Sequence, residues 1–305
     1  MPPIVADRSR LSADAATINA METTTLIEAD ALRARHNLGD WVILDCRFDL
    51  AAATKGRDDF LHAHIPAAQY ADLNRDLSAP VTAASGRHPL PDPRDFARRA
   101  GGWGIGNDTT TILYDQSNGS HAARAWWLLR WIGATRVAVL NGGLDAWIRS
   151  GGTVESGDGA TPAPRPFELR LRERFFLTTD QVAAALTDPA TALVDARASP
   201  RFRGETEPID PVAGHVPGAE NFPFAQNLGA DGRFLAPAAL HERWSVLLRG
   251  RRPAAVISMC GSGVTACHNL LALEIAGLHG AQLYAGSWSE WIRDPARGVA
   301  RSLSD

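Results

Sequence analysis

The chain is organised around the stretch Cys260-Gly261-Ser262-Gly263-Val264-Thr265. Residues 254–259 before it form an apolar run with the length of a buried strand, and residues 266–276 after it carry apolar side chains at helical spacing. Cys260 is therefore expected on a tight turn at the carboxyl end of a strand, where open α/β sheets bind their ligands. The glycines allow successive backbone N–H groups to point inward, and the following helix adds its positive end. This setting favours a thiolate and predicts that Cys260 is a nucleophile; the alternative is a buried structural cysteine.

A strand, a cysteine loop and a helix also describe the cysteine phosphatases, so the loop must be compared with theirs. A phosphatase loop places an arginine six positions after the cysteine, and here that position is Ala266, with the next arginine at Arg293. Without this cation, phosphoryl transfer lacks its main electrostatic stabiliser. The sequence therefore argues against a phosphatase-like or arsenate-reducing enzyme, and the short uncharged loop suits a sulfur atom bound to Cys260.

The two halves of the chain repeat one another. The segments that correspond are 42–47 with 192–197, 60–66 with 212–217, 110–115 with 254–259, and 140–147 with 284–291. An offset of about 150 residues is too long for a solenoid repeat and fits two tandem domains. Within each half, β-rich runs alternate with helical patterns such as 122–132 and 237–248, which predicts an α/β fold with a mainly parallel sheet flanked by helices.

Composition places the domain boundaries. Residues 1–22 are polar and without an apolar core, and we predict a disordered tail there, with Met21 as an alternative start to Met1. Residues 151–168 begin with a stretch rich in Gly, Pro, Ser and Thr and are predicted to be a linker. The first domain is then 23–150 and the second is 169–305. The first half has Asp115 to Ser120 where the second has its cysteine loop, so the chemistry is assigned to the second domain.

Charge and cysteine content exclude several classes of function. The formal net charge is −3 without a basic stripe, which argues against nucleic acid as a partner. Three cysteines in 305 residues form no disulfide framework, and no paired Cys-x2-Cys spacing supports a zinc site, so no metal is expected. No apolar run reaches membrane-spanning length. We therefore expect a cytoplasmic protein.

Three motifs resemble those of the rhodanese-like sulfurtransferases. They are the cysteine loop itself, the segment Ala281-Gln282-Leu283-Tyr284-Ala285-Gly286-Ser287-Trp288-Ser289-Glu290-Trp291, and the turn Gly214-His215-Val216-Pro217-Gly218-Ala219. The resemblance covers roughly residues 25 to 295. It implies two tandem rhodanese-like domains, the first inactive and the second catalytic. It also implies transfer of sulfur through a Cys260 persulfide to a thiol, a thioredoxin-like dithiol or cyanide, without a metal or organic cofactor.

The resemblance also assigns roles to individual residues. Arg201 is implied as the arginine that binds the donor anion, and the backbone of Gly261 to Thr265, with the hydroxyls of Ser262 and Thr265, as the persulfide site. The supporting residues implied are Arg197 and Glu290 as an internal salt bridge, Asp195 as a hydrogen-bond acceptor for backbone near the loop, and His64, with Asp58 or Asp59, as a relay to the loop serine. For His64 a turn-stabilising role is the alternative.

The identity of the sulfur donor remains open between two compounds. Thiosulfate enzymes of the family carry a basic pair after the cysteine, whereas this chain has Gly261 and Ser262, as in the mercaptopyruvate branch. That branch usually has a second arginine after a Glu-Pro pair, whereas here Glu207-Pro208 is followed by Ile209. We favour 3-mercaptopyruvate over thiosulfate. The alternatives are a thiosulfate sulfurtransferase proper and a persulfide carrier that serves a biosynthetic partner.

Overall fold

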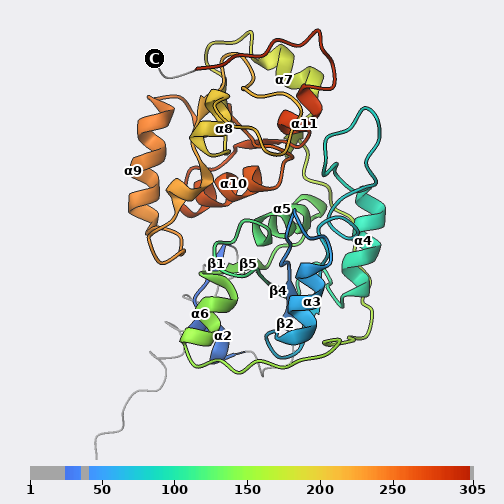
Figure 1. The fold of residues 1–305 in the computed structure, drawn as a ribbon. Coiled ribbons are helices and arrows are strands. Elements are labelled where there is room, and N and C mark those ends of the chain that lie inside the picture. Colours follow the sequence, from blue (N-terminus) through green and yellow to red (C-terminus); the bar gives the residue numbers. More distant parts are fainter. Residues whose placement is uncertain (1–24, 36–40, 303–305) are drawn as a thin grey trace, which may run out of the picture.

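Two five-stranded parallel sheets form the framework of the protein (Figure 1). The structure is a computed structural model, and it describes residues 25–35 and 41–302. The strand order is β1-β5-β4-β2-β3 in the first sheet and β6-β10-β9-β7-β8 in the second, so each strand of the second sheet has its counterpart five strands earlier. All strand pairs are parallel. The α/β class and the tandem duplication predicted from the sequence are confirmed.

The elements of the first sheet and its helices come from the first half of the chain. They are β1 (Leu26–Ile27), α2 (Ala29–Arg33), β2 (Trp41–Asp45), α3 (Lys55–His62), β3 (Ala68–Tyr70), α4 (Pro93–Gly102), β4 (Thr110–Tyr114), α5 (Ala122–Ile132), β5 (Val137–Leu140) and α6 (Gly143–Arg149).

The second half supplies the other sheet and its helices. They are β6 (Phe176–Leu177), α7 (Thr179–Ala185), β7 (Ala192–Asp195), α8 (Ser199–Arg203), β8 (Glu220–Asn221), the 3-10 helix η1 (Phe224–Asn227), α9 (Pro237–Leu248), the 3-10 helix η2 (Pro253–Ala255), β9 (Val256–Met259), α10 (Thr265–Ile275), β10 (Gln282–Tyr284) and α11 (Ser287–Trp291). The helix predicted to start at Thr178 is capped there, because Thr178 and Gln181 exchange hydrogen bonds as a capping box.

The helices α5 and α10 pack against each other between the two sheets (Figure 1). Both are buried over almost their whole length, and one hydrophobic core includes residues of both. A helix without a continuous polar face is stable in water only when it is buried on all sides, and α5 and α10 meet this condition. Since α10 begins at Thr265, this packing places the cysteine loop against the first domain.

Residues 151–175 connect the two halves along the surface of the first domain. They form no helix or strand, apart from an isolated bridge between Glu155 and His64. Backbone N–H groups of Ala160, Arg165 and Arg170 donate to carbonyls of the first domain at 2.9–3.0 Å. The domain boundaries drawn from composition stay predictions, and the predicted tail 1–22 lies outside the described residues.

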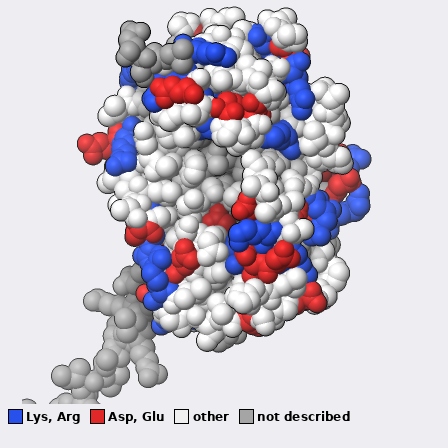
Figure 2. Space-filling model, viewed as in Figure 1, with Lys and Arg blue, Asp and Glu red and all other residues white. Residues whose placement is uncertain are grey.

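The surface carries acidic and basic side chains in a mixed pattern. Figure 2 shows both signs interspersed on one face of the molecule, without a continuous basic area there. Within the described residues, no helix is both long enough and apolar enough to cross a membrane.

Candidate active site

The cysteine loop directs two backbone N–H groups at the sulfur of Cys260. The N–H of Ser262 lies 3.4 Å and that of Gly263 3.1 Å from Sγ, and the side chain is buried. The backbone N–H of Cys260 donates to Oγ of Ser287 at 3.0 Å, which anchors the start of the loop to the first residue of α11. The loop therefore surrounds the sulfur with donors that stabilise negative charge on it.

Gly263 is required by the shape of this loop. Its φ is +78°, and a Cβ atom added there would lie 2.4 Å from the carbonyl oxygen of Ala285. Both observations exclude an ordinary side chain at this position, because a positive φ strains other residues and the oxygen belongs to fixed backbone.

We expect Gly263→Ala to destabilise the protein well beyond the cost of the positive φ alone. Gly218→Ala is the matched control, because Gly218 has a φ of +81° and no atom within 4 Å of its added Cβ. The control should cost about 1–2 kcal/mol of unfolding free energy, and Gly263→Ala at least about 2 kcal/mol more from the collision. Urea unfolding of both variants measures the difference. Equal losses would show that the loop can move away from Ala285.

A cavity of about 270 Å³ opens in front of Cys260 between the two domains. From the second domain it is lined by the predicted residues Arg201, Arg197, Gly261, Ser262, Val264 and Thr265, and also by Ala196, Ala198, Ile209 and Phe224. From the first domain it is lined by Phe48, Leu50, Leu73, Arg87, His88 and His121. The cavity is small, one part of its wall is apolar, and its polar groups converge on the cysteine loop.

Arginines and carboxylates form a cluster beside this cavity. Nε and Nη2 of Arg201 donate to Glu207 at 3.2 and 2.7 Å, and Nη2 also reaches Asp210 at 3.2 Å. Arg87 of the first domain forms an ion pair with the other oxygen of Asp210. The side chains of Glu207 and Asp210 are each 3% exposed, so these pairs are shielded from solvent.

The prediction of a salt bridge between Arg197 and Glu290 is wrong. Arg197 instead pairs with Asp195 at 2.7 Å and with Glu207 at 3.3 Å, and its guanidinium lies over the ring of Trp288. Glu290 accepts hydrogen bonds from Thr179 and from the backbone N–H of Gly86. Asp195 also accepts from the backbone N–H of Arg197 at 2.9 Å. Asp195 therefore binds both the backbone and the guanidinium of Arg197, two residues further along the chain.

His64 does not reach the cysteine loop, and the relay expected from it is a misassignment. Its Nδ1 lies 2.7 Å from the carbonyl oxygen of Phe60, and its ring stacks on the Phe60 ring. His215 makes the same two contacts with Phe202 in the second domain. Because both copies of the duplicated turn use their histidine in this way, the turn-stabilising role explains both.

The histidine that contacts the loop serine is His88. Its Nδ1 lies 2.8 Å from Oγ of Ser262, across 174 residues of sequence. His88 is preceded by Arg87 and followed by Pro89 in a stretch without helix or strand, and only this unusual composition could have drawn attention to it. Burial lowers the pKa of His88 to about 3, so its imidazole is neutral near pH 7.

The segment that carries Arg87 and His88 is attached to the second domain. The backbone N–H of Gly86 donates to Glu290 at 3.2 Å, that of Arg87 donates to Oγ of Ser289 at 3.1 Å, and Arg293 donates to the carbonyl of Ser85 at 3.2 Å. Glu290 and Ser289 belong to α11, so the motif 281–291 of the second domain fixes a first-domain loop beside the cavity.

A buried arginine lies behind the loop. Arg124 of α5 donates to the carbonyl oxygens of Gly263 at 3.2 Å and His88 at 3.1 Å. It is fully buried and makes no ion pair with a carboxylate in the part of the chain that the structure describes. Burial lowers the pKa of its guanidinium. The first domain thus supplies a positive charge behind the cysteine loop.

The folded protein should lose stability as the pH falls below about 6.5, because histidines are buried in the neutral state. His88 and His268 are among them, and burial also lowers the pKa of His121. Burial lowers the pKa of His88 to about 3 and that of His268 to about 4. Below the unfolded value of about 6.5 the unfolded chain takes up protons that the folded chain excludes, so each histidine costs roughly 2 kcal/mol of unfolding free energy by pH 5.

Urea unfolding between pH 7 and pH 5 measures this loss. His88→Asn keeps a polar side chain but removes the group that titrates. It should reduce the slope of unfolding free energy against pH by the equivalent of about one proton. If the unfolding free energy depends on pH equally in the variant and the unmodified protein, folding does not keep His88 unprotonated.

The loop of the first domain that corresponds to the cysteine loop holds a carboxylate. Asp115 follows β4 as Cys260 follows β9, and its carboxylate accepts from the backbone N–H groups of Gly119 and His121 at 2.9 Å and of Ala122 at 3.3 Å. The backbone N–H groups of this loop thus donate to the Asp115 carboxylate, where those of the cysteine loop donate to a sulfur. This arrangement explains why the first domain supports the cavity but has no nucleophile in it.

The other two cysteines are buried without such a loop. Burial raises the pKa of Cys46 well above its usual value and that of Cys267 to about 12. The thiol of Cys267 donates to the carbonyl of Gly263 at 3.3 Å. Both stay protonated near neutral pH and serve as core thiols.

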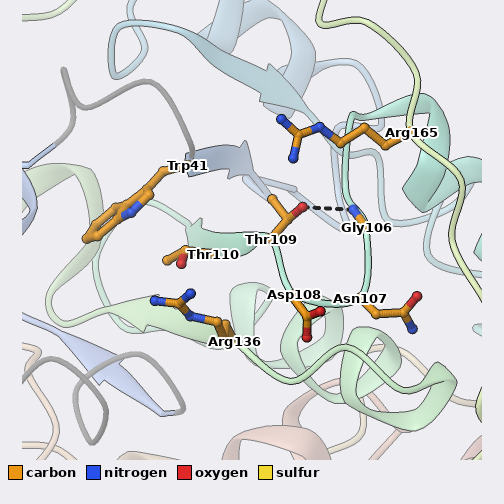
Figure 3. Close-up of a pocket in the computed structure, with 8 residues that line it drawn as sticks. All are labelled: Trp41, Gly106, Asn107, Asp108, Thr109, Thr110, Arg136 and Arg165. Atoms are coloured by element: carbon orange, nitrogen blue, oxygen red, sulfur yellow. Dashed lines mark hydrogen bonds between the residues drawn. The ribbon is translucent and has the colours of Figure 1, made fainter.

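A second, larger cavity of about 550 Å³ lies at the amino ends of β2 and β4, away from the ends that carry the candidate site (Figure 3). It is lined by Trp41, Gly106, Asn107, Asp108, Thr109, Thr110, Arg136 and Arg165. None of these residues is a cysteine or a histidine, and the hydrogen bond drawn there joins the N–H of Gly106 to Thr109.

Comparison with known proteins identifies the family. The model of the rhodanese-like domain matches residues 28–150 and 178–294. A probable 3-mercaptopyruvate sulfurtransferase of Pseudomonas aeruginosa is 50% identical over 92% of this chain and 99% of its own length. The human 3-mercaptopyruvate sulfurtransferase is 35% identical over 86% of this chain and 89% of its own length, and a putative thiosulfate sulfurtransferase of Mycobacterium tuberculosis is 38% identical over 92% and 98%.

A solved structure shows the same fold. The crystal structure of the 3-mercaptopyruvate sulfotransferase from Escherichia coli has a TM-score of 0.74 and 31% identity, and the match covers 88% of this chain and all of that one. The family match falls on both halves of the chain, each with the same strand order and the second with a cysteine loop. The chain therefore belongs to the rhodanese family of sulfurtransferases, as a protein with two tandem rhodanese-like domains.

Proposed function

We propose that this sulfurtransferase takes sulfur from 3-mercaptopyruvate, with thiosulfate as a weaker donor, and carries it as a persulfide on Cys260. The observation that carries the proposal is the pair of N–H contacts to Sγ at the end of a small cavity that three arginines border. Donors of this size, with one anionic end and a transferable sulfur, match a cavity of about 270 Å³.

In the first half of the reaction, the Cys260 thiolate attacks the sulfur of 3-mercaptopyruvate. A sulfur–sulfur bond forms and the carbon–sulfur bond breaks, and the electron pair leaves with the carbon as the enolate of pyruvate, which takes up a proton. In the second half, an acceptor thiolate or cyanide attacks the outer sulfur, and the Cys260 thiolate is released. With thiosulfate, the leaving group of the first half is sulfite.

The loop and Ser262 supply the groups that this chemistry requires. The N–H groups of Ser262 and Gly263, which contact Sγ, stabilise the thiolate before attack and after release of the sulfur. The Ser262 hydroxyl lines the cavity and can donate to the oxygen on which the enolate charge develops. His88 holds this hydroxyl at 2.8 Å, and as a neutral imidazole it does so without adding a charge.

The uncharged loop supports 3-mercaptopyruvate as the preferred donor. Gly261 and Ser262 carry no charge beside Cys260, whereas thiosulfate is a dianion that needs basic residues at its outer end. The relatives include proteins named for each donor, which supports a site that accepts both. The alternative is a persulfide carrier that serves a biosynthetic partner, and a tight complex with another protein would favour it.

Steady-state rates with both donors and one acceptor test the proposal. We expect a higher kcat/KM for 3-mercaptopyruvate than for thiosulfate with a thioredoxin-like dithiol or with cyanide. After incubation with donor alone, the peptide that contains Cys260 should gain the mass of one sulfur atom. A higher kcat/KM for thiosulfate would assign the enzyme to the alternative donor, and absence of the mass gain with both donors would refute the persulfide.

A further inference from the structure

A groove of about 640 Å³ lies at the outer edge of the second sheet, between the edge strand β8 and helix α9. Phe202, Phe222 and Val246 give it apolar walls, and Val246 is 73% exposed, the highest value among the large apolar side chains that the structure describes. None of its lining residues also lines the cavity of Cys260. Apolar side chains exposed together in a groove are typical of an interaction site.

The internal duplication shows what covers the corresponding place in the first domain. There the segment that connects the domains passes over β3, the counterpart of β8, and the N–H of Ala160 donates to the carbonyl of Ala68 at 3.0 Å. The N–H of Arg165 then donates to the carbonyl of Gly101 in α4 at 2.9 Å. Prolines alternate with other residues from 162 to 166, which keeps this stretch extended. An extended segment therefore covers the edge strand and the end of the helix that follows it.

The second domain repeats the beginning of this path. The isolated bridge between His215 and Ala300 repeats the bridge between His64 and Glu155. At the same offset, the position that corresponds to Ala160 is 305, which lies outside the described residues. Within residues 25–35 and 41–302, nothing covers β8 as the connecting segment covers β3.

The edge of β8 presents unpaired backbone groups to the groove. The carbonyl oxygen of Ala219, the counterpart of Ala68, accepts no hydrogen bond from any residue that the structure describes. Phe222 donates its N–H to Asp195 of β7, so the N–H of the preceding Asn221 points to the opposite, open side. Edge strands with free groups of this kind can pair with an extended peptide.

The rim of the groove selects for acidic side chains. Arg243 makes no ion pair with a carboxylate in the described part of the chain, and Glu220, the acidic residue of the lining, already pairs with Arg249 at 3.3 Å. The segment that covers the first domain makes a contact of this type, because its Asp158 pairs with Arg57 of α3 at 2.7 Å. A carboxylate in the occupant would give Arg243 the partner that it lacks.

We propose that the groove beside β8 binds an extended, acidic segment of a partner protein. Its backbone pairs with the edge of β8 as the connecting segment pairs with β3, an apolar side chain covers Val246, and a carboxylate meets Arg243. The proposal goes beyond the sulfur-transfer reaction and does not depend on the sulfur donor, because the groove and the cavity of Cys260 share no lining residue among those described.

A synthetic peptide with the sequence of residues 156–167 and the substitution Arg165→Glu serves as the probe, because position 165 contacts α4, the counterpart of α9. We expect calorimetry to show that it binds the full chain. Val246→Glu should raise its Kd at least about 10-fold and Arg243→Ala about 3-fold. Val81→Glu is the matched control, since Val81 is 57% exposed outside the groove, and its Kd should not change. Sulfur transfer to cyanide should be unaffected by Val246→Glu.

Hydrogen exchange tests the pairing at the edge strand. Saturation with the peptide should slow exchange of the Asn221 amide at least about 10-fold, because this N–H then donates to the peptide. Absence of binding at millimolar peptide, or the same Kd for Val246→Glu and the unmodified protein, would refute the groove as a docking site. Equal affinity for the peptide without Arg165→Glu would refute an acidic occupant.

Two further outcomes would assign the groove to another occupant and overturn the proposal. One is binding of the peptide only after deletion of residues 303–305, which would mean that the chain itself covers β8. The other is a dimer in sedimentation analysis that Val246→Glu converts to a monomer, which would mean that a second copy covers it.

Discussion

Replacing Cys260 by serine is expected to abolish sulfur transfer with both donors. The serine hydroxyl has nearly the same shape and can still accept from the N–H groups of Ser262 and Gly263, so the loop should remain folded. It forms no persulfide, because a hydroxyl near neutral pH is neither ionised nor able to hold sulfane sulfur. Turnover should fall to the background rate, and the mass gain of one sulfur atom on the loop peptide should disappear.

The other cysteines provide the controls for this prediction. Cys46→Ser and Cys267→Ser remove buried thiols that burial keeps protonated, and both variants should retain most of the activity of the unmodified enzyme. Some loss of stability is expected at Cys267, because a hydroxyl there is fully buried beside the carbonyl of Gly263. Turnover of the Cys260 variant at the unmodified rate would contradict the assignment of the nucleophile.

The parts of the fold that could be predicted from the sequence are those specified locally or by repetition. The strand before Cys260 and the helix after it follow from apolar runs of the appropriate length, and the two domains follow from segments that recur after about 150 residues. The duplication also indicated the turn-stabilising role of His64. Its counterpart His215 lies in a turn of the same sequence pattern, and both histidines bind a phenylalanine carbonyl.

The contacts that complete the site could not be predicted, because they depend on how the two domains pack. His88 contacts Ser262 across 174 residues, and Arg87 pairs with Asp210 across 123. No periodicity in the first half indicates which side of it faces the cysteine loop. The partner of Arg197 was assigned wrongly for a different reason. Asp195 and Glu207 are close to it in sequence and in space, whereas the carboxylate of Glu290 is used by Gly86 and Thr179.

Arg201→Ala is the second change with a large expected effect. Arg201 is held by Glu207 and Asp210 so that Nη1 remains directed at the loop beside Cys260. A charge-assisted contact to the donor is worth about 1.5–3 kcal/mol, which corresponds to roughly 10- to 150-fold in kcat/KM if it persists in the transition state. We expect a loss of this size with both donors, measured in steady state. Arg201→Lys should recover only part of it, because an ammonium lacks the planar fork that Glu207 and the donor share.

The position after Glu207-Pro208 then distinguishes between donors. Ile209 lines the cavity and is 41% exposed, so an arginine there can reach a bound carboxylate without displacing buried groups. Ile209→Arg should improve catalytic efficiency with 3-mercaptopyruvate more than with thiosulfate, and most clearly in the Arg201→Ala background, where a cation has been lost. If Arg201→Ala leaves both donors unaffected, the anion must be bound by Arg87 alone or outside this cluster. If Ile209→Arg improves thiosulfate turnover more, the carboxylate does not lie on this side of the cavity.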